Sequence, residues 1–178
     1  MRLFQYYTRI HMKRPYLLST LLLISFGAFA QKDVIRIQSC DNSMIQHQVD
    51  SLKLLYNKDG FVLLKEASVA MESEYELPVV VPLAEGGWYQ FVFVGDYTSK
   101  LYEVRMYDWN EKMVVYQKKQ WGDVDGNIIS YSYIPKFTEY HMMKPLQVNK
   151  KKKKGLCGYV MLLKKTQGTP TATPPKTQ

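Results

Sequence analysis

The central part of the chain alternates between apolar and polar positions with a period of two. Between residues 101 and 107, Val104 and Met106 fall on one face, and Glu103 and Arg105 fall on the other. This alternation, combined with many β-branched and aromatic residues, is typical of strands in a half-buried antiparallel sheet.

Turn residues, mainly Gly, Pro, Asn and Asp, divide this region into eight or nine predicted strands. The strands are expected at 61–64, 68–71, 77–81, 88–94, 101–107, 113–117, 127–134, 140–148 and 157–163, with a short one at 34–38. Pro78 and Pro82 favour an edge position for the strand at 77–81, because proline cannot donate a hydrogen bond to a neighbouring strand. So many strands favour two packed sheets. The predicted fold class is mostly β: an antiparallel β-sandwich of jelly-roll-like type.

The segment 41–57 follows a helical period instead. Its apolar residues recur at spacings of four, three and four: Ile45, Val49, Leu52 and Tyr56. This spacing predicts one amphipathic helix of about four turns. We expect Asp41 or Ser43 to cap its N-terminus, and we expect the helix to cover an open face or end of the sandwich.

The two ends of the chain have compositions of their own. Residues 1–30 combine Lys13-Arg14, a short apolar run and Ala28-Phe29-Ala30, which predicts a cleaved signal peptide, with Met12 as an alternative translation start. The apolar run is shorter than the about 20 residues of a membrane span, so no stable span is expected after cleavage. We expect an exported protein, periplasmic or at the cell surface, with a helical segment at 31–60, a sandwich domain at 61–165 and a disordered Thr/Pro-rich tail at 166–178.

Cys40 and Cys157 are the only cysteines of the chain. Export would place them in an oxidising compartment, where a disulfide between them persists. Such a bridge would tie the start of the mature chain to its last strand. Two separate buried thiols are the alternative, because the sequence holds no information on the distance between them.

The formal charge of +8 suggests an anionic partner, but the distribution of the charge along the chain weakens this interpretation. Four basic residues, Arg2, Arg9, Lys13 and Arg14, precede the cleavage site without any acidic residue, so the mature chain carries +4. Its lysines concentrate in one run, Lys150 to Lys154. The run is interpreted either as an electrostatic patch or as a solvated hairpin whose charges oppose association of sheet edges. A nucleic-acid partner is not expected.

The order of aromatic segments resembles a known family. An aromatic-led strand at 88–93 precedes a strand ending in Met106-Tyr107-Asp108, and Tyr131–Pro135 and Glu139–His141 follow. Over about residues 86–148 this order resembles the prepeptidase C-terminal-type β-sandwich modules of exported bacterial proteins. The helix, the lysine run and the last strand depart from that pattern. The resemblance implies a jelly-roll-like fold and a non-catalytic accessory role, without implying a ligand.

Residues suited to catalysis are scarce. The sequence contains no G-x-S-x-G, H-E-x-x-H, Walker or dinucleotide-binding motif. Of the histidines, only His47 and His141 follow the predicted cleavage site, and a hydrolase triad would need one of them beside a serine and an acidic residue. The predicted function is therefore a non-catalytic accessory or interaction module with a protein or glycan partner. A carbohydrate-binding or calcium-binding module is the first alternative, and a small hydrolase is the second.

Candidate ligand-binding residues lie in the predicted turns. Tryptophans near turns, among them Trp88, can stack on sugars or anchor an interface, or alternatively cap the ends of the core. Asp123, Asp125 and Asn127 alternate in one loop and offer oxygen ligands to calcium, the one candidate cofactor, although these are also ordinary turn residues. The predicted site joins residues at one end of the sandwich to the lysine run: Trp109, Trp121, Asp123, Asp125, Lys150, Lys151, Lys152, Lys153 and Lys154.

Overall fold

The structure is a computed structural model that describes residues 39–124 and 126–166. The predicted signal peptide, the predicted strand at 34–38, Asp125 and residues 167–178 lie outside the described residues. Thr166, which the sequence places at the start of the tail, donates two hydrogen bonds to the carbonyl of Gly60. In the described ranges, no helix is both long enough and apolar enough to cross a membrane.

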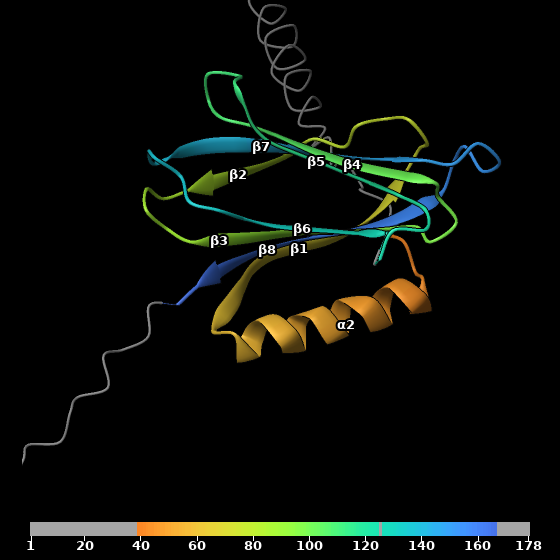
Figure 1. Cartoon of the computed structure of the whole chain (residues 1–178), viewed down its shortest axis with the longest axis horizontal. Helices are drawn as coiled ribbons and strands as arrows, with labels where there is room; N and C mark the ends of the chain where they lie inside the picture. The colour runs from red at the N-terminus through yellow and green to blue at the C-terminus, as the bar shows by residue number, and fades with distance from the viewer. Residues whose placement is uncertain (1–38, 125, 167–178) are drawn as a thin grey trace, which may run out of the picture. The chain divides into compact units, whose positions relative to one another are not determined.

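The described residues form one helix followed by eight strands (Figure 1). The elements are α2 (Ser43–Lys58), β1 (Phe61–Met71), β2 (Val79–Leu83), β3 (Tyr89–Gly95), β4 (Leu101–Tyr107), β5 (Met113–Gln120), β6 (Ile128–Tyr133), β7 (Glu139–Val148) and β8 (Leu156–Lys165). The predicted strands at 61–64 and 68–71 are one continuous strand, β1, whose register shifts at a bulge between Leu63 and Lys65.

The strands form two four-stranded antiparallel sheets. Sheet A has the order β1-β8-β3-β6, and sheet B has the order β2-β7-β4-β5. The first strand pairs with the last, the second with the seventh, the third with the sixth and the fourth with the fifth. This is the connectivity of a jelly roll, so the predicted fold class is confirmed. The edge position predicted for β2 from its prolines is also confirmed.

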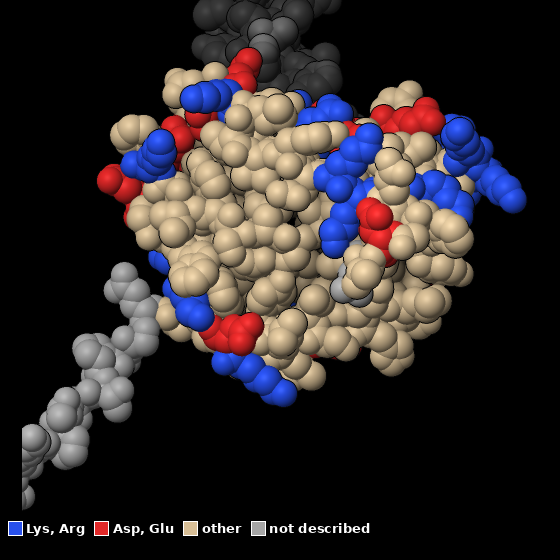
Figure 2. All heavy atoms as spheres, viewed as in Figure 1, with Lys and Arg blue, Asp and Glu red and all other residues tan. Residues whose placement is uncertain are grey.

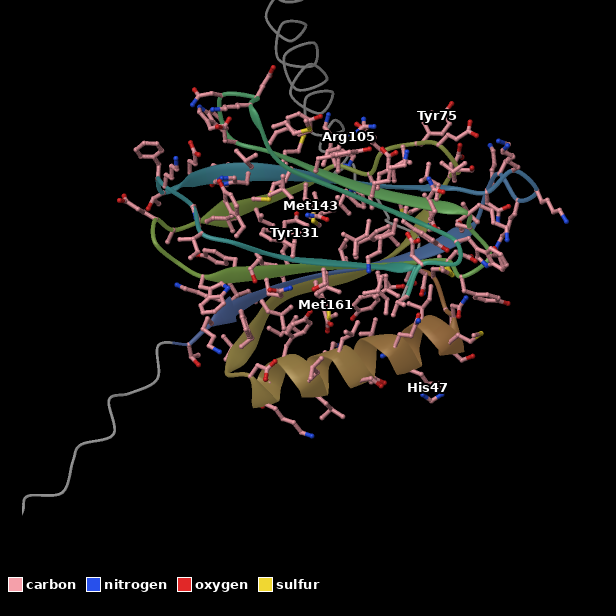
Figure 3. The ribbon with its side chains drawn as sticks, in the orientation of Figure 1. His47, Tyr75, Arg105, Tyr131, Met143 and Met161 are labelled. Atoms are coloured by element: carbon pink, nitrogen blue, oxygen red, sulfur yellow. A yellow bond between two sulfur atoms is a disulfide. The ribbon has the colours of Figure 1, made fainter. Side chains whose placement is uncertain are left out.

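Two apolar layers hold the fold together. The first lies between the sheets and includes Phe91, Val104 and Met143. The second lies between sheet A and α2 and includes Val49 and Met161, as Figure 3 shows for Met161. Because β3 and β8 face an apolar layer on both sides, their sequences are nearly continuous apolar runs. Strands β4 and β7 contact only the layer between the sheets, and their burial therefore alternates, except at Glu103, which is buried on the outer face of β4.

The helix α2 begins at a different cap from the two that the sequence indicates. Its N-cap is Asn42, whose Oδ1 accepts hydrogen bonds from the backbone N–H groups of Met44 (3.1 Å) and Ile45 (3.2 Å). The prediction of Asp41 or Ser43 is therefore wrong by one residue in either direction. The backbone is extended at Asn42, and this conformation lets a short side chain reach the first free N–H groups.

Replacing Asn42 with alanine is expected to lower the free energy of unfolding by about 1 kcal/mol, because two helix N–H groups lose their acceptor. Urea unfolding followed by far-UV circular dichroism measures this loss. Asp41→Ala is the matched control and should change stability by less than about 0.5 kcal/mol. Equal losses of stability in both variants would show that the side chain of Asn42 does not stabilise the helix as its N-cap.

Candidate functional site

The outer face of sheet B combines charged and aromatic side chains. Arg105 of β4 lies in register with Tyr116 of β5 and with Lys144 of β7. These residues point away from the core, because Val104 and Met106 on either side of Arg105 are fully buried. In the described part of the chain, no element covers this outer face, whereas α2 lies against sheet A (Figure 1). The outer face of sheet B is the candidate site.

A network of ion pairs crosses the middle of this face. Arg105 donates through Nη1 to Oε1 of Glu76 (2.7 Å) and through Nη2 to Oε2 of Glu103 (2.8 Å). Lys118 lies 3.7 Å from the carboxylate of Glu103, and Lys144 lies 3.4 Å from that of Glu76. The hydrogen bond to Glu103 raises the pKa of Arg105. The guanidinium is thus held in one position by two carboxylates.

Aromatic rings flank the network. The ammonium of Lys144 lies 5.0 Å from the ring centroid of Tyr107, and the guanidinium of Arg105 lies 6.0 Å from that of Tyr116. Trp109 of the β4–β5 turn lies against Tyr140 of β7, with their ring centroids 6.2 Å apart and the ring planes at 47°, and the two residues are 70% and 54% exposed. Trp, Tyr and Arg are the residues enriched at the energetic centres of protein interfaces. Exposed rings of this kind also stack on sugars.

The predicted tryptophan site does not form at one end of the sandwich. Trp109 precedes β5 and Trp121 follows it, so a strand of 8 residues, about 27 Å long, separates them. Trp121 is 65% exposed and packs against Lys100, whose ammonium lies 3.6 Å from the ring centroid. The alternative that the tryptophans cap the core is wrong for both residues, because most of each side chain is exposed. Trp88 is half-exposed and contacts Phe61 edge to face.

Two of the three residues of the predicted calcium loop, Asp123 and Asn127, form hydrogen bonds within the protein. Oδ2 of Asp123 accepts a hydrogen bond from the backbone N–H of Gln120 (2.8 Å). The side-chain amides of Asn127 and Gln48 donate to each other, at 2.8 and 3.2 Å, and tie α2 to β6. Among the residues that the structure describes, which exclude Asp125, no three His, Cys, Asp or Glu side chains cluster for a metal. Calcium binding stays a prediction.

The lysine run forms the β7–β8 loop. Three of its five ammonium groups lie close to acidic side chains: Lys152 with Asp96 (3.6 Å), Lys153 with Glu74 (3.1 Å) and Lys154 with Glu72 (3.5 Å). Figure 2 shows blue and red side chains side by side at this end of the molecule. Because these pairs balance most of the positive charge, the loop is a weaker electrostatic patch than its sequence indicates.

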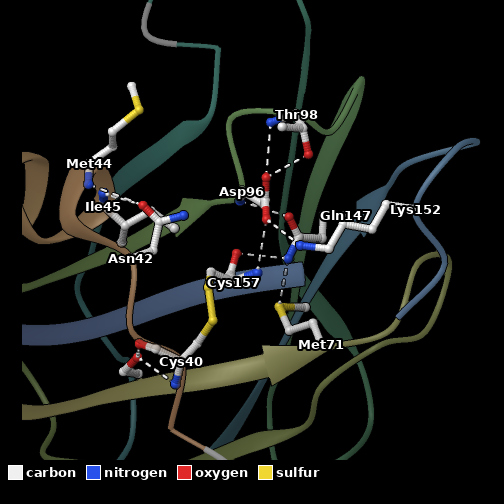
Figure 4. Close-up of a disulfide and its surroundings, with 11 residues drawn as sticks. Cys40, Asn42, Met44, Ile45, Met71, Asp96, Thr98, Gln147, Lys152 and Cys157 are labelled. Carbon is white, nitrogen blue, oxygen red and sulfur yellow. Dashed lines mark hydrogen bonds and ion pairs between the residues drawn. A yellow bond between two sulfur atoms is a disulfide. The ribbon is translucent and has the colours of Figure 1, made fainter. Parts of the chain in front are cut away.

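A buried polar cluster fastens the base of this loop (Figure 4). The carboxylate of Asp96, which is 2% exposed, accepts hydrogen bonds from the backbone and hydroxyl of Thr98 (3.0 and 2.7 Å) and from the backbone N–H of Cys157 (3.1 Å). Gln147 accepts from the N–H of Asp96 (2.8 Å) and donates to the carbonyl of Cys157 (3.1 Å). The cluster therefore joins the β3–β4 turn to β7 and β8.

The structure contains the disulfide that Cys40 and Cys157 allow. Their Cα atoms lie 5.5 Å apart, within the range of native disulfides. Cys40 also exchanges hydrogen bonds with the side chain of Ser68 on β1, at 3.2 and 2.6 Å. The start of the domain is thus attached to both β1 and β8.

The two histidines of the described chain lie apart from each other. His47 is exposed on α2. His141 is buried, and its Nε2 lies 3.1 Å from the hydroxyl of Tyr133 and 3.6 Å from a carboxylate oxygen of Glu139. The hydrolase alternative requires a serine beside a histidine, and His141 instead contacts a tyrosine.

The comparisons with known proteins concern the fold. No protein-family profile and no curated protein matches the chain. Among solved structures, the chain is similar to the pre-peptidase C-terminal domain of a collagenase from Bacillus anthracis, with 10% identity and a TM-score of 0.42 over 56% of this chain and 89% of that one. It is also similar to part of the Glycosylation Associate Protein (Gap123) complex from Streptococcus agalactiae, with 12% identity and a TM-score of 0.30 over 59% of this chain and 39% of that one. The predicted resemblance to prepeptidase C-terminal-type modules is confirmed, and at these values neither likeness bears on ligand or activity.

Proposed function

We propose that the protein is an exported, non-catalytic interaction module that holds a protein partner on the outer face of sheet B. The observation that carries the proposal is the exposed pair Trp109 and Tyr140 on the same face as the fixed guanidinium of Arg105. Large aromatic rings and arginine supply much contact energy when a partner excludes water from them. Export to the periplasm or cell surface rests on the predicted signal peptide, and the disulfide supports it, because disulfides persist in oxidising compartments.

The ion-pair network makes this face suitable for a folded partner. Arg105 is already immobilised by Glu76 and Glu103, so little side-chain entropy remains to be lost on binding. The network and the rings extend over β4, β5 and β7, which gives a broad surface. A broad, preorganised surface with aromatic anchors fits a protein better than a small molecule.

A glycan is the second candidate partner, on a separate observation. Trp109 and Tyr140 are tilted by 47° and each exposes more than half of its surface, so their ring faces are available to a sugar. Carboxylates and cations of the network lie on the same face and can hydrogen-bond to hydroxyl groups.

The test compares binding by immobilised mature protein and by the double variant Trp109→Ala/Tyr140→Ala. Proteins of the producer's cell envelope and a glycan panel are offered to both. Trp121→Ala is the matched control, because it removes an equally exposed tryptophan from the other end of β5.

The wild type and the control should retain the same partner, and the double variant should bind it at least about tenfold more weakly. A retained envelope protein supports the first candidate, and a retained glycan supports the second. Equal retention by the double variant would place the binding surface elsewhere.

A further inference from the structure

A cavity of about 200 Å³ opens between the two sheets, on the side where β1 and β2 form their edges. The two strands are not paired with each other, because β1 bonds only to β8 and β2 only to β7. The cavity reaches inward to Phe91 of β3 and to Met143 of β7. Strands about 4.8 Å apart place Phe91 about 10 Å from the β1 edge. The cavity is therefore a slot that enters the core.

The walls of the slot are aliphatic on both sides. Sheet A and sheet B contribute small and branched side chains that face each other: Ala67, Val69, Val160, Leu162, Val79 and Val81. An apolar core cavity of about 150 Å³ excludes water and binds benzene, so scaling its six carbons by volume gives a ligand chain of about eight carbons for this slot. An apolar chain in the slot would gain the dispersion contacts that opposing walls supply.

Among the residues that the structure describes, one charged side chain at the mouth of the slot has no ion-pair partner. Glu66 lines the mouth, but its carboxylate binds the ammonium of Lys53 at 2.5 Å and accepts a hydrogen bond from Tyr159. Lys65 lies in register with Leu162, on the side of β1 that faces the slot, and it forms no ion pair with any residue of the described ranges. The mouth therefore presents a free ammonium group above an apolar interior.

We propose that this slot binds an alkanoate of about eight carbons, with the chain between the sheets and the carboxylate at Lys65. The apolar walls select the hydrocarbon, and a charge-assisted hydrogen bond from Lys65 selects the anionic head. The site is separate from the outer face of sheet B, because its walls belong to the interior of the sandwich.

The test titrates the mature protein with octanoate, octanol and octylamine, by isothermal calorimetry and by thermal melts. Octanoate should bind most tightly, octanol about tenfold more weakly and octylamine most weakly, because the head groups pair with, ignore and repel an ammonium. Lys65→Met keeps the side-chain stem and should reduce octanoate affinity about tenfold while leaving octanol unchanged. Lys112→Met, in the exposed β4–β5 turn, is the matched control and should change neither affinity.

Two further variants locate the ligand. Ala67→Leu fills the slot from sheet A and Val79→Phe fills it from sheet B, so either folded variant should lose binding of octanoate and octanol. A cooperative thermal transition shows which variant is folded. No octanoate binding at millimolar concentration, unchanged affinity in Lys65→Met or unchanged affinity in the filled variants would overturn the proposal. Binding to phosphatidylglycerol vesicles without binding of free octanoate would also overturn it, in favour of a lipid surface.

Discussion

Replacement of Cys40 and Cys157 with serine is expected to lower the free energy of unfolding by about 5 kcal/mol. The disulfide joins residues 117 positions apart, so in the unfolded chain it closes almost the whole domain into one loop. That loop restricts the unfolded state and makes its conformational entropy smaller, which stabilises the folded state. Because domains are usually stable by about 5–15 kcal/mol, the loss is a large part of the total. Equilibrium unfolding in urea, followed by tryptophan fluorescence, measures it.

Reduction of the wild type separates the bridge from the effect of the serine side chains. In the presence of a reductant, the wild type should unfold at nearly the urea concentration of the double serine variant. The variant should be insensitive to the reductant, because both cysteines of the chain have been replaced. If oxidised and reduced wild type share one midpoint, the bridge does not stabilise the domain.

The strands were predictable because each core imposes a pattern on the sequence. Strands β4 and β7 cover one core only and their sequences alternate, whereas β3 and β8 separate two cores and their sequences are nearly continuous apolar runs. The order of strands within each sheet was not predictable in the same way. The pairing of β1 with β8 joins the ends of the domain, and no local pattern encodes a contact over that distance.

The N-cap residue of α2 could not be predicted from residue type. Asp41, Asn42 and Ser43 are all good capping residues, so composition alone does not choose between them. The choice depends on where the backbone leaves its extended conformation, and the contact between Cys40 and Ser68 fixes the chain just before that point.

The candidate site was predictable only in part. Trp109 was identified from its place in a turn, but its partner is Tyr140 and not Trp121. The turns before and after one strand lie at opposite ends of a sheet. Because one predicted strand separates Trp109 from Trp121, the sequence was sufficient to show that the two tryptophans lie far apart. The contact of Arg105 with Glu76 had no sequence signal, because Glu76 comes from the segment between β1 and β2. Asp96 and Gln147 resemble ordinary turn and strand residues until the fold buries them.

Replacement of Asp96 with alanine is expected to lower the free energy of unfolding by about 3 kcal/mol at pH 7. The change leaves the buried N–H of Cys157 without its acceptor and removes two partly buried hydrogen bonds from the N–H and hydroxyl of Thr98. Unpaired buried donors cost about 1–3 kcal/mol each, partly recovered where water enters. Asp50→Ala, which removes an exposed carboxylate from α2, is the control and should cost less than about 0.5 kcal/mol. Urea unfolding of both variants measures the difference, and equal losses would contradict the anchoring role.

We expect the stabilisation by Asp96 to depend on pH, because it comes from the charged form of the carboxylate. Burial acts to raise the pKa of Asp96, but the hydrogen bonds from Thr98 and Cys157 and the charge of Lys152 outweigh burial and lower the pKa below its ordinary value of 3.8. The unfolded state then takes up a proton more readily, so the stabilisation is complete above the unfolded pKa and is lost as the pH falls through the folded pKa. The stability difference between wild type and Asp96→Asn should therefore be constant near neutral pH and decrease below about pH 4. Urea unfolding of both proteins between neutral and acidic pH measures this difference, and a difference that does not change with pH would show that the carboxylate acts by its shape and not by its charge.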